Sequence, residues 1–156
     1  MYGHFAIRDW LVEPAVQDTN QLVTAARQHV VATDGLQVII SPNARTFVTV
    51  HLQRRGSAPD PDDGSTTPWD DTVDVQVQFP SGRIYIDQPT MEDIDLDDAL
   101  NGENGTYTMR VAWRGRPTEN SPAVESAEAA EEYLITVWRT GPLSDSVAAE
   151  YRDDED

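Results

Sequence analysis

The sequence predicts a mainly β protein: an antiparallel two-sheet β-sandwich with one N-terminal helix, over about residues 20–33. Three observations carry this prediction. Several segments alternate apolar and polar residues with a period of two, the pattern of a strand buried on one face. Turn-forming residues separate many of these segments, and one segment alone has helical spacing. About seven strands with connections of hairpin length fit two sheets packed face to face.

The helix is predicted from apolar residues at helical spacing, which are Leu22, Ala26 and Val30. Asp18 or Thr19 stands ahead of them as a candidate N-cap, whose side chain would accept hydrogen bonds from the first backbone N–H groups. Gly35 follows as a stop signal.

Three strands are expected around this helix. Residues 5–10 form the first strand, and residues 36–40 and 46–52 form the next two. The last two flank the segment Ser41-Pro42-Asn43-Ala44-Arg45, which indicates a hairpin with a longer loop.

The C-terminal half contains the clearest alternation, over residues 73–79, 83–87 and 107–113. Pro80-Ser81-Gly82 supplies turn residues between the first two of these strands. Residues 133–138 are richer in apolar side chains, which is typical of a strand covered on both faces.

These elements fit one domain over residues 1–143, followed by an acidic tail over residues 144–156. A chain of 156 residues is long enough to bury a core of its own. Prolines, glycines and acids predict mobile acidic loops at residues 56–71 and 116–130. A last helical turn is expected in the tail.

The charge of the chain limits what it binds. It has 28 Asp and Glu against 11 basic residues, all of them Arg, and a formal net charge of −17. Such a surface repels nucleic acid and anionic membranes and attracts a basic protein partner. The N-terminus lacks the pattern of a signal peptide, and no apolar stretch approaches the roughly 20 residues that cross a bilayer. We therefore expect a cytoplasmic protein without direct nucleic-acid or membrane binding.

No catalytic motif or cofactor motif stands out, so the sequence predicts neither an enzyme nor a cofactor. The chain has no cysteine, no Gly-rich phosphate loop and no Gly-x-Ser-x-Gly elbow. Its three histidines, His4, His29 and His51, share no recognised motif.

An EF-hand loop is the nearest match to a metal site, and it fails. Asp93, Asp95 and Asp97 have the 1-3-5 spacing of calcium ligands. Position 6 is Asp98 instead of Gly, and position 12 is Asn104 instead of Glu. The site prediction therefore contains no metal ligand, although a calcium-dependent binding module stays open as an alternative function.

The same acids alternate with Ile94 and Leu96, which indicates a strand that turns the two apolar residues toward the core. Carboxylates on the other face would then stand about 6.6–6.8 Å apart, close to the spacing of phosphates on a nucleic-acid strand. Such a row can enter a basic cleft made for phosphates. With the acidic loop around Trp69, it defines the predicted partner-binding residues: Glu92, Asp93, Asp95, Asp97, Asp98, Trp69, Asp70 and Asp71.

The chain also resembles the competence protein J family, inhibitors of a DNA-entry nuclease. The resemblance rests on four segments in order: Tyr2-Gly3-His4-Phe5, Ala32-Thr33-Asp34-Gly35-Leu36, Asn43-Ala44-Arg45-Thr46-Phe47-Val48-Thr49-Val50-His51-Leu52 and Asn104-Gly105-Thr106-Tyr107-Thr108-Met109-Arg110-Val111-Ala112-Trp113. It covers most of residues 2–52 and about ten residues near 104–113. The loops at 54–72 and 115–130 look longer than the family pattern.

The resemblance implies an intracellular protein that binds a nuclease and blocks it. Composition agrees with such an inhibitor or immunity protein, whose surface carboxylates would occupy a basic or metal-loaded cleft. An accessory or structural subunit of a phage or secretion assembly is the other alternative. The oligomeric state is left open.

Overall fold

The protein is described from a computed structural model, over residues 4–13, 16–42, 49–56, 69, 71–88, 91–96, 99–115 and 131–151. In this part of the chain the elements are, in order, β1 Phe5–Asp9, α1 Val16–His29, β2 Val31–Thr33, β3 Gln37–Ile40, β4 Thr49–Arg55, β5 Asp71–Phe79, β6 Ile84–Gln88, β7 Met91–Asp95, β8 Gly105–Arg114, β9 Glu132–Gly141 and α2 Asp145–Glu150.

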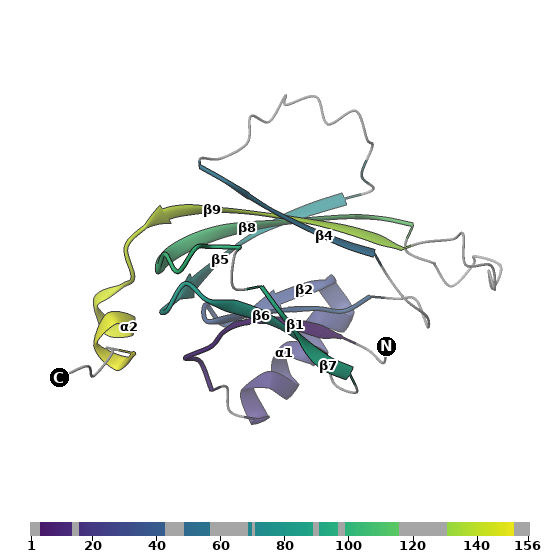
Figure 1. The fold of residues 1–156 in the computed structure, drawn as a ribbon. Coiled ribbons are helices and arrows are strands. Elements are labelled where there is room, and N and C mark those ends of the chain that lie inside the picture. Colours follow the sequence, from purple (N-terminus) through teal and green to yellow (C-terminus); the bar gives the residue numbers. More distant parts are fainter. Residues whose placement is uncertain are drawn as a thin grey trace.

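The strands form two sheets that face each other, so the predicted β-sandwich is confirmed (Figure 1). The order is β2-β3-β1-β6-β7 in the five-stranded sheet and β4-β9-β8-β5 in the four-stranded sheet. All of these pairs are antiparallel except β4 with β9, which is parallel. No described helix is long and apolar enough to span a membrane.

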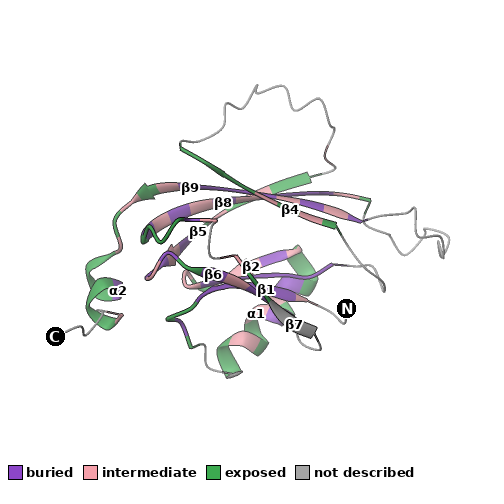
Figure 2. Cartoon of the chain, in the orientation of Figure 1, coloured by how far each residue is buried: buried purple, intermediate pink, exposed green. Residues whose placement is uncertain are grey.

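The core lies between the sheets and is built from the inward residues of alternating strands. Tyr107, Met109 and Val111 of β8 are fully buried, while Thr108 and Arg110 between them are half-buried on the other face. Figure 2 shows many buried residues in the strands of the two sheets, whereas most of α2 is exposed. The Tyr107 hydroxyl donates to the Glu103 carbonyl at 2.5 Å, which satisfies its one polar group at the core boundary.

Helix α1 packs on the outer face of the five-stranded sheet, away from the four-stranded one (Figure 1). Val23 and Ala26 of the helix meet Ala6 of β1 and Ile39 of β3 in a second, smaller apolar cluster. The small side chains of Ala6 and Ala26 allow the helix to approach the sheet closely. One outer face of the sandwich is therefore covered by a described helix.

The helix begins and ends earlier than predicted. It spans Val16–His29, so Asp18 lies in its first turn instead of preceding it, and the predicted residues 31–33 form strand β2. The reason is the backbone of Val30, which takes a φ of +75° and breaks the helical path. Gly35, with a φ of +95°, belongs to the turn between β2 and β3 and does not end the helix.

The predicted hairpin between residues 36–40 and 46–52 is wrong. Strand β3 pairs with β1 and β2, whereas β4 lies in the other sheet beside β9. The chain also changes sheets at Pro80-Ser81-Gly82, between β5 and β6. Alternation indicates that a strand has one buried face. It does not identify the partner strand, because two strands in facing sheets alternate in the same way as two hydrogen-bonded strands of one sheet.

The two sides of the sandwich differ. On one side β5 contacts β2 and β3, and the Gln78 N–H donates to the Gly35 carbonyl at 2.7 Å. On the other side the edge strands β4 and β7 leave a groove between them, which is part of the candidate site.

Candidate functional site

The predicted acidic strand exists as β7, at the edge of the five-stranded sheet. Its register places Ile94 opposite Ile86 and Asp95 opposite Tyr85 on the neighbouring strand β6. Because directly opposed residues share a face, Ile94 lies on the core side and Asp95 on the outer side. Asp95 is exposed, as the alternation predicts for a residue on the outer face of the strand.

Ile94 is less buried than the sequence predicts, because 47% of it is exposed. It lines the groove between β4 and β7, together with Leu96, Val50 and Leu52. The groove has a volume of about 420 Å³ and mostly apolar walls. Strand β7 therefore has the exposed Asp95 on one face and an open apolar groove on the other.

The other predicted site residues are only partly placed. Asp70, Asp97 and Asp98 lie outside the described residues, and so do most of the two predicted loops. Glu92 and Asp93 lie in β7, but their side chains are outside the description. The described residues contain no group of three or more side chains suited to hold a metal ion.

Trp69 and Asp71 lie with the other sheet. Asp71 is exposed at the start of β5, where its carboxylate accepts the Thr72 N–H at 2.8 Å. Trp69 is half-buried, and the guanidinium carbon of Arg114 stands 4.7 Å from the centre of its ring. The predicted site residues that the structure describes therefore lie with two different sheets.

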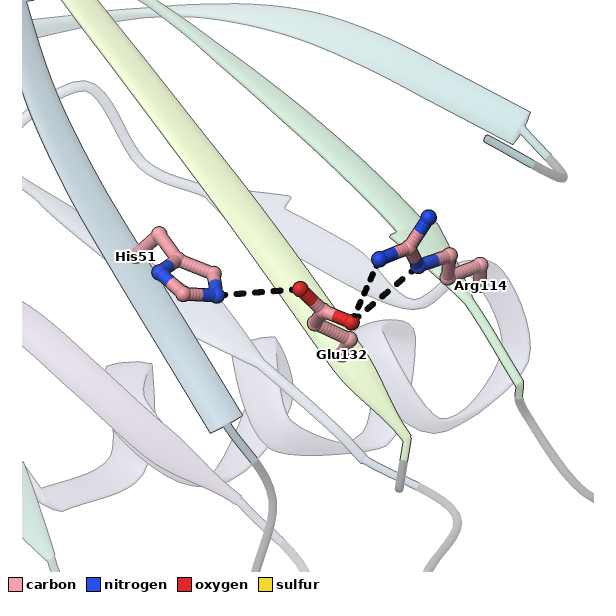
Figure 3. Close-up of polar contacts among 3 residues, drawn as sticks. All are labelled: His51, Arg114 and Glu132. Carbon is pink, nitrogen blue, oxygen red and sulfur yellow. Dashed lines mark hydrogen bonds and ion pairs between the residues drawn. The ribbon is translucent and has the colours of Figure 1, made fainter. Parts of the chain in front are cut away.

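Arg114 also belongs to a polar network on the outer face of the four-stranded sheet (Figure 3). Its Nε and Nη2 donate to Oε1 of Glu132 at 3.1 and 2.8 Å, and Nε2 of His51 lies 3.0 Å from Oε2. One carboxylate thus connects β4, β9 and β8. The hydrogen bond from Arg114 is the main cause that lowers the pKa of Glu132, and His51 adds to it.

This network connects three strands of the sheet, and its geometry differs from that of a catalytic site. Glu132 and Arg114 are half-buried and His51 is 53% exposed at its side chain, so water reaches all three. A general base needs a desolvated carboxylate or imidazole aimed at a nucleophile. Here both carboxylate oxygens of Glu132 are engaged by cationic partners or the imidazole.

We expect Glu132→Gln to destabilise the protein by about 1 kcal/mol near neutral pH, the scale of a solvent-screened ion pair. Because the folded pKa of Glu132 is lowered from its ordinary value of 4.5, the stabilisation is present above that pH and is lost as the pH falls through the folded pKa. Urea unfolding at a series of pH values measures this effect. The difference in free energy of unfolding between wild type and variant should shrink below about pH 4.5. Glu150→Gln, on the exposed face of α2, is the control, and a gap that widened in acid would contradict the assignment.

Sequence reasoning missed a second aromatic position, the turn after β1. Trp10 and Leu11 are 48% and 43% exposed, which is unusual for two large apolar neighbours in a folded domain. The available signal was their place directly after a strand and ahead of Pro14, where the chain must turn. Asp9, which holds this turn, is fully buried at an inward strand position.

Two solved structures have the same fold at low sequence identity. One is ComJ from Bacillus subtilis, an inhibitor of the DNA-degrading activity of NucA, with a TM-score of 0.60 and 16% identity over 90% of both chains. Another is the product of crocagin biosynthetic gene J, with a TM-score of 0.54 and 19% identity over 88% of this chain and 90% of that one. No protein-family model and no curated protein matches the sequence. The chain therefore has a ComJ-like fold.

Proposed function

We propose that this chain is a non-enzymatic inhibitor that binds a nuclease and blocks its action on DNA. The observation that carries the proposal is the fold shared with ComJ, a similarity that spans 90% of both chains. ComJ itself inhibits a DNA-degrading protein. The expectation from sequence, an acidic β-sandwich that blocks a nuclease, points to the same function.

Electrostatics supply the means of recognition. A nuclease binds a polyanion, so its cleft is basic or loaded with metal ions. A partner with a net charge of −17 is drawn to such a cleft, and association can rise well above the unsteered ~10⁵–10⁶ M⁻¹s⁻¹. Asp95 is exposed on β7, an edge strand with no neighbouring strand beyond it in the described sheet.

Inhibition would follow from occupation of the cleft. Carboxylates paired with the basic groups that bind phosphates compete directly with DNA, and no chemical step by the inhibitor is needed. The partner-binding residues predicted from the sequence (Glu92, Asp93, Asp95, Asp97, Asp98, Trp69, Asp70 and Asp71) remain part of this proposal. A cytoplasmic location, where such an inhibitor would protect the cell's own DNA, also remains part of it.

The proposal is tested by titrating the purified protein into a DNA-degradation assay with the nuclease encoded beside its gene. We expect degradation to stop near a one-to-one ratio and calorimetry with a catalytically inactive nuclease to show binding. Affinity should fall as salt rises, because exposed charges are screened within about 8–10 Å at physiological ionic strength. Undiminished degradation at a large excess of the protein, without measurable binding, would contradict the proposal.

A further inference from the structure

The turn that exposes Trp10 and Leu11 is held rigidly by Asp9. The carboxylate of Asp9 accepts the Leu11 N–H at 2.9 Å, the Ser81 N–H and hydroxyl at 2.8 Å each and the Gly82 N–H at 3.0 Å. The Trp10 N–H also donates to the Arg83 carbonyl at 2.9 Å. These bonds join the turn to the segment between β5 and β6. The exposure of the two apolar side chains is therefore a property of an ordered surface.

The indole ring of Trp10 is fixed as well. It stacks on Tyr85 of β6 with a centroid distance of 4.5 Å and an angle of 28° between the rings. Binding through this ring would cost little side-chain entropy, because the ring is already ordered in the free protein. Tryptophan is one of the residue types enriched among the hot spots that dominate the energy of protein interfaces.

The acidic strand β7 lies next to β6, which carries Tyr85 of this stack. Tyr85 lies directly opposite Asp95 in the β6–β7 register, and β7 has three acids among its five residues, Met-Glu-Asp-Ile-Asp. Strands β1, β6 and β7 are neighbours in that order in the five-stranded sheet (Figure 1). Arg83 is exposed beside the turn and offsets part of this charge, while the Arg8 charge is paired with Asp87. An aromatic plane next to an acidic strand is complementary to a cation.

Two other tryptophans of the described structure make cation–π contacts with arginines. The guanidinium carbon of Arg114 stands 4.7 Å from the Trp69 ring centre, and that of Arg110 stands 5.3 Å from the Trp138 ring centre. Arg110 also binds the carboxylate of Asp74 through two nitrogens, at 2.8 and 3.0 Å. Tryptophan, arginine and aspartate thus already form one unit on the four-stranded sheet. Trp10 and Asp95 repeat two members of that unit on the five-stranded sheet.

We propose that the surface formed by Trp10, Leu11, Tyr85 and Asp95 is the main contact with the nuclease and receives an arginine of a basic segment. The guanidinium stacks on the indole of Trp10 and pairs with the carboxylate of Asp95, as planar guanidinium groups do with both partners. Leu11 packs against the apolar stem of the same segment. This inference rests on the proposed function and chooses one of the two sheets that the predicted residues occupy.

The test measures binding and inhibition with the nuclease encoded beside the gene. We expect Trp10→Ala to weaken binding about 30-fold or more, the loss associated with an interface hot spot. Trp10→Phe should keep most of the affinity, because an aromatic face remains. Asp95→Asn should slow association several-fold at low salt and make it less sensitive to added salt.

The control lies outside both the proposed contact and the predicted partner-binding residues. Glu150→Gln removes a carboxylate from the exposed face of α2 and should change the affinity less than about threefold, within the near-neutral range of interface positions. Thermal unfolding verifies that each variant is folded, and Leu11→Ser replaces Trp10→Ala if that variant is not. Wild-type inhibition with unchanged affinity of the Trp10 and Asp95 variants overturns this inference alone. A wild type that neither binds nor inhibits overturns the proposed function and this inference with it.

Discussion

Replacing Asp9 with alanine is expected to lower the free energy of unfolding by about 4 kcal/mol, because each buried donor left without an acceptor costs about 1–3 kcal/mol. The carboxylate is fully buried and accepts four hydrogen bonds, from Leu11, Ser81 and Gly82. Water entering the vacated space would restore part of the loss. Asp9→Asn should also destabilise the protein, because its amide group would direct donors at N–H groups.

Urea unfolding monitored by circular dichroism measures this effect. The control is Asp71→Ala, since Asp71 is exposed and, among the described residues, accepts a local hydrogen bond from the adjacent Thr72. We expect the control to lose less than about 1 kcal/mol, as surface substitutions do. A similar small loss for Asp9→Ala would show that the four hydrogen bonds contribute little to the stability of the sandwich.

Gly82→Ala is expected to lower the free energy of unfolding by about 3–5 kcal/mol, because it combines backbone strain with overpacking. Gly82 has a φ of +73°, a region that side chains with a Cβ rarely adopt. A Cβ there would also stand 2.5 Å from the backbone nitrogen and carbonyl carbon of Glu103. Because backbone atoms cannot rotate away, the segment between β7 and β8 or the turn itself would have to move.

Gly56→Ala is the matched control, because nothing lies within 4 Å of its Cβ position and its φ is not in the left-handed region. We expect its free energy of unfolding to change by less than about 1 kcal/mol, in either direction. The comparison separates the local conflict at Gly82 from the general effect of adding a methyl group. Equal stabilities of the two variants would mean that the Gly82 turn is easily displaced.

Both predictions concern the place where the chain passes from one sheet to the other, next to the proposed contact surface. Asp9 joins the end of β1 to the turn before β6. The same residue orders the turn that exposes Trp10 and Leu11. On the proposed contact surface, Asp9 variants that still fold should therefore also bind the proposed nuclease partner more weakly.

Local alternation in the sequence was enough to find most strands. Strands β5, β8 and β9 lie where apolar and polar residues alternate or where apolar residues accumulate. Residues 133–138 were expected to be covered on both faces, and Ile135, Thr136, Val137 and Trp138 are all buried. The reason is that the period of two depends only on the pleat of the strand itself.

The pairing of the strands within the sheets could not be predicted from the alternation. The parallel pairing of β4 with β9 joins residues more than 80 positions apart, and the change of sheet after β3 leaves no mark on the alternation. The end of α1 was missed for a related reason. Val30 continues the apolar spacing of the helix, but its backbone turns at φ +75° so that Val31–Thr33 can pair with β3.

The sequence by itself determined the class of fold, the net charge of −17 and the alternation that places Asp95 and Ile94 on opposite faces of one strand. Only the tertiary structure decided which side chains meet. It exposed Ile94 at the open side of the sandwich, paired Trp69 with Arg114 and set Trp10 on Tyr85 beside the acidic strand. Periodicity is a property of neighbours along the chain, whereas a binding surface is made by side chains that long-range strand pairing brings together.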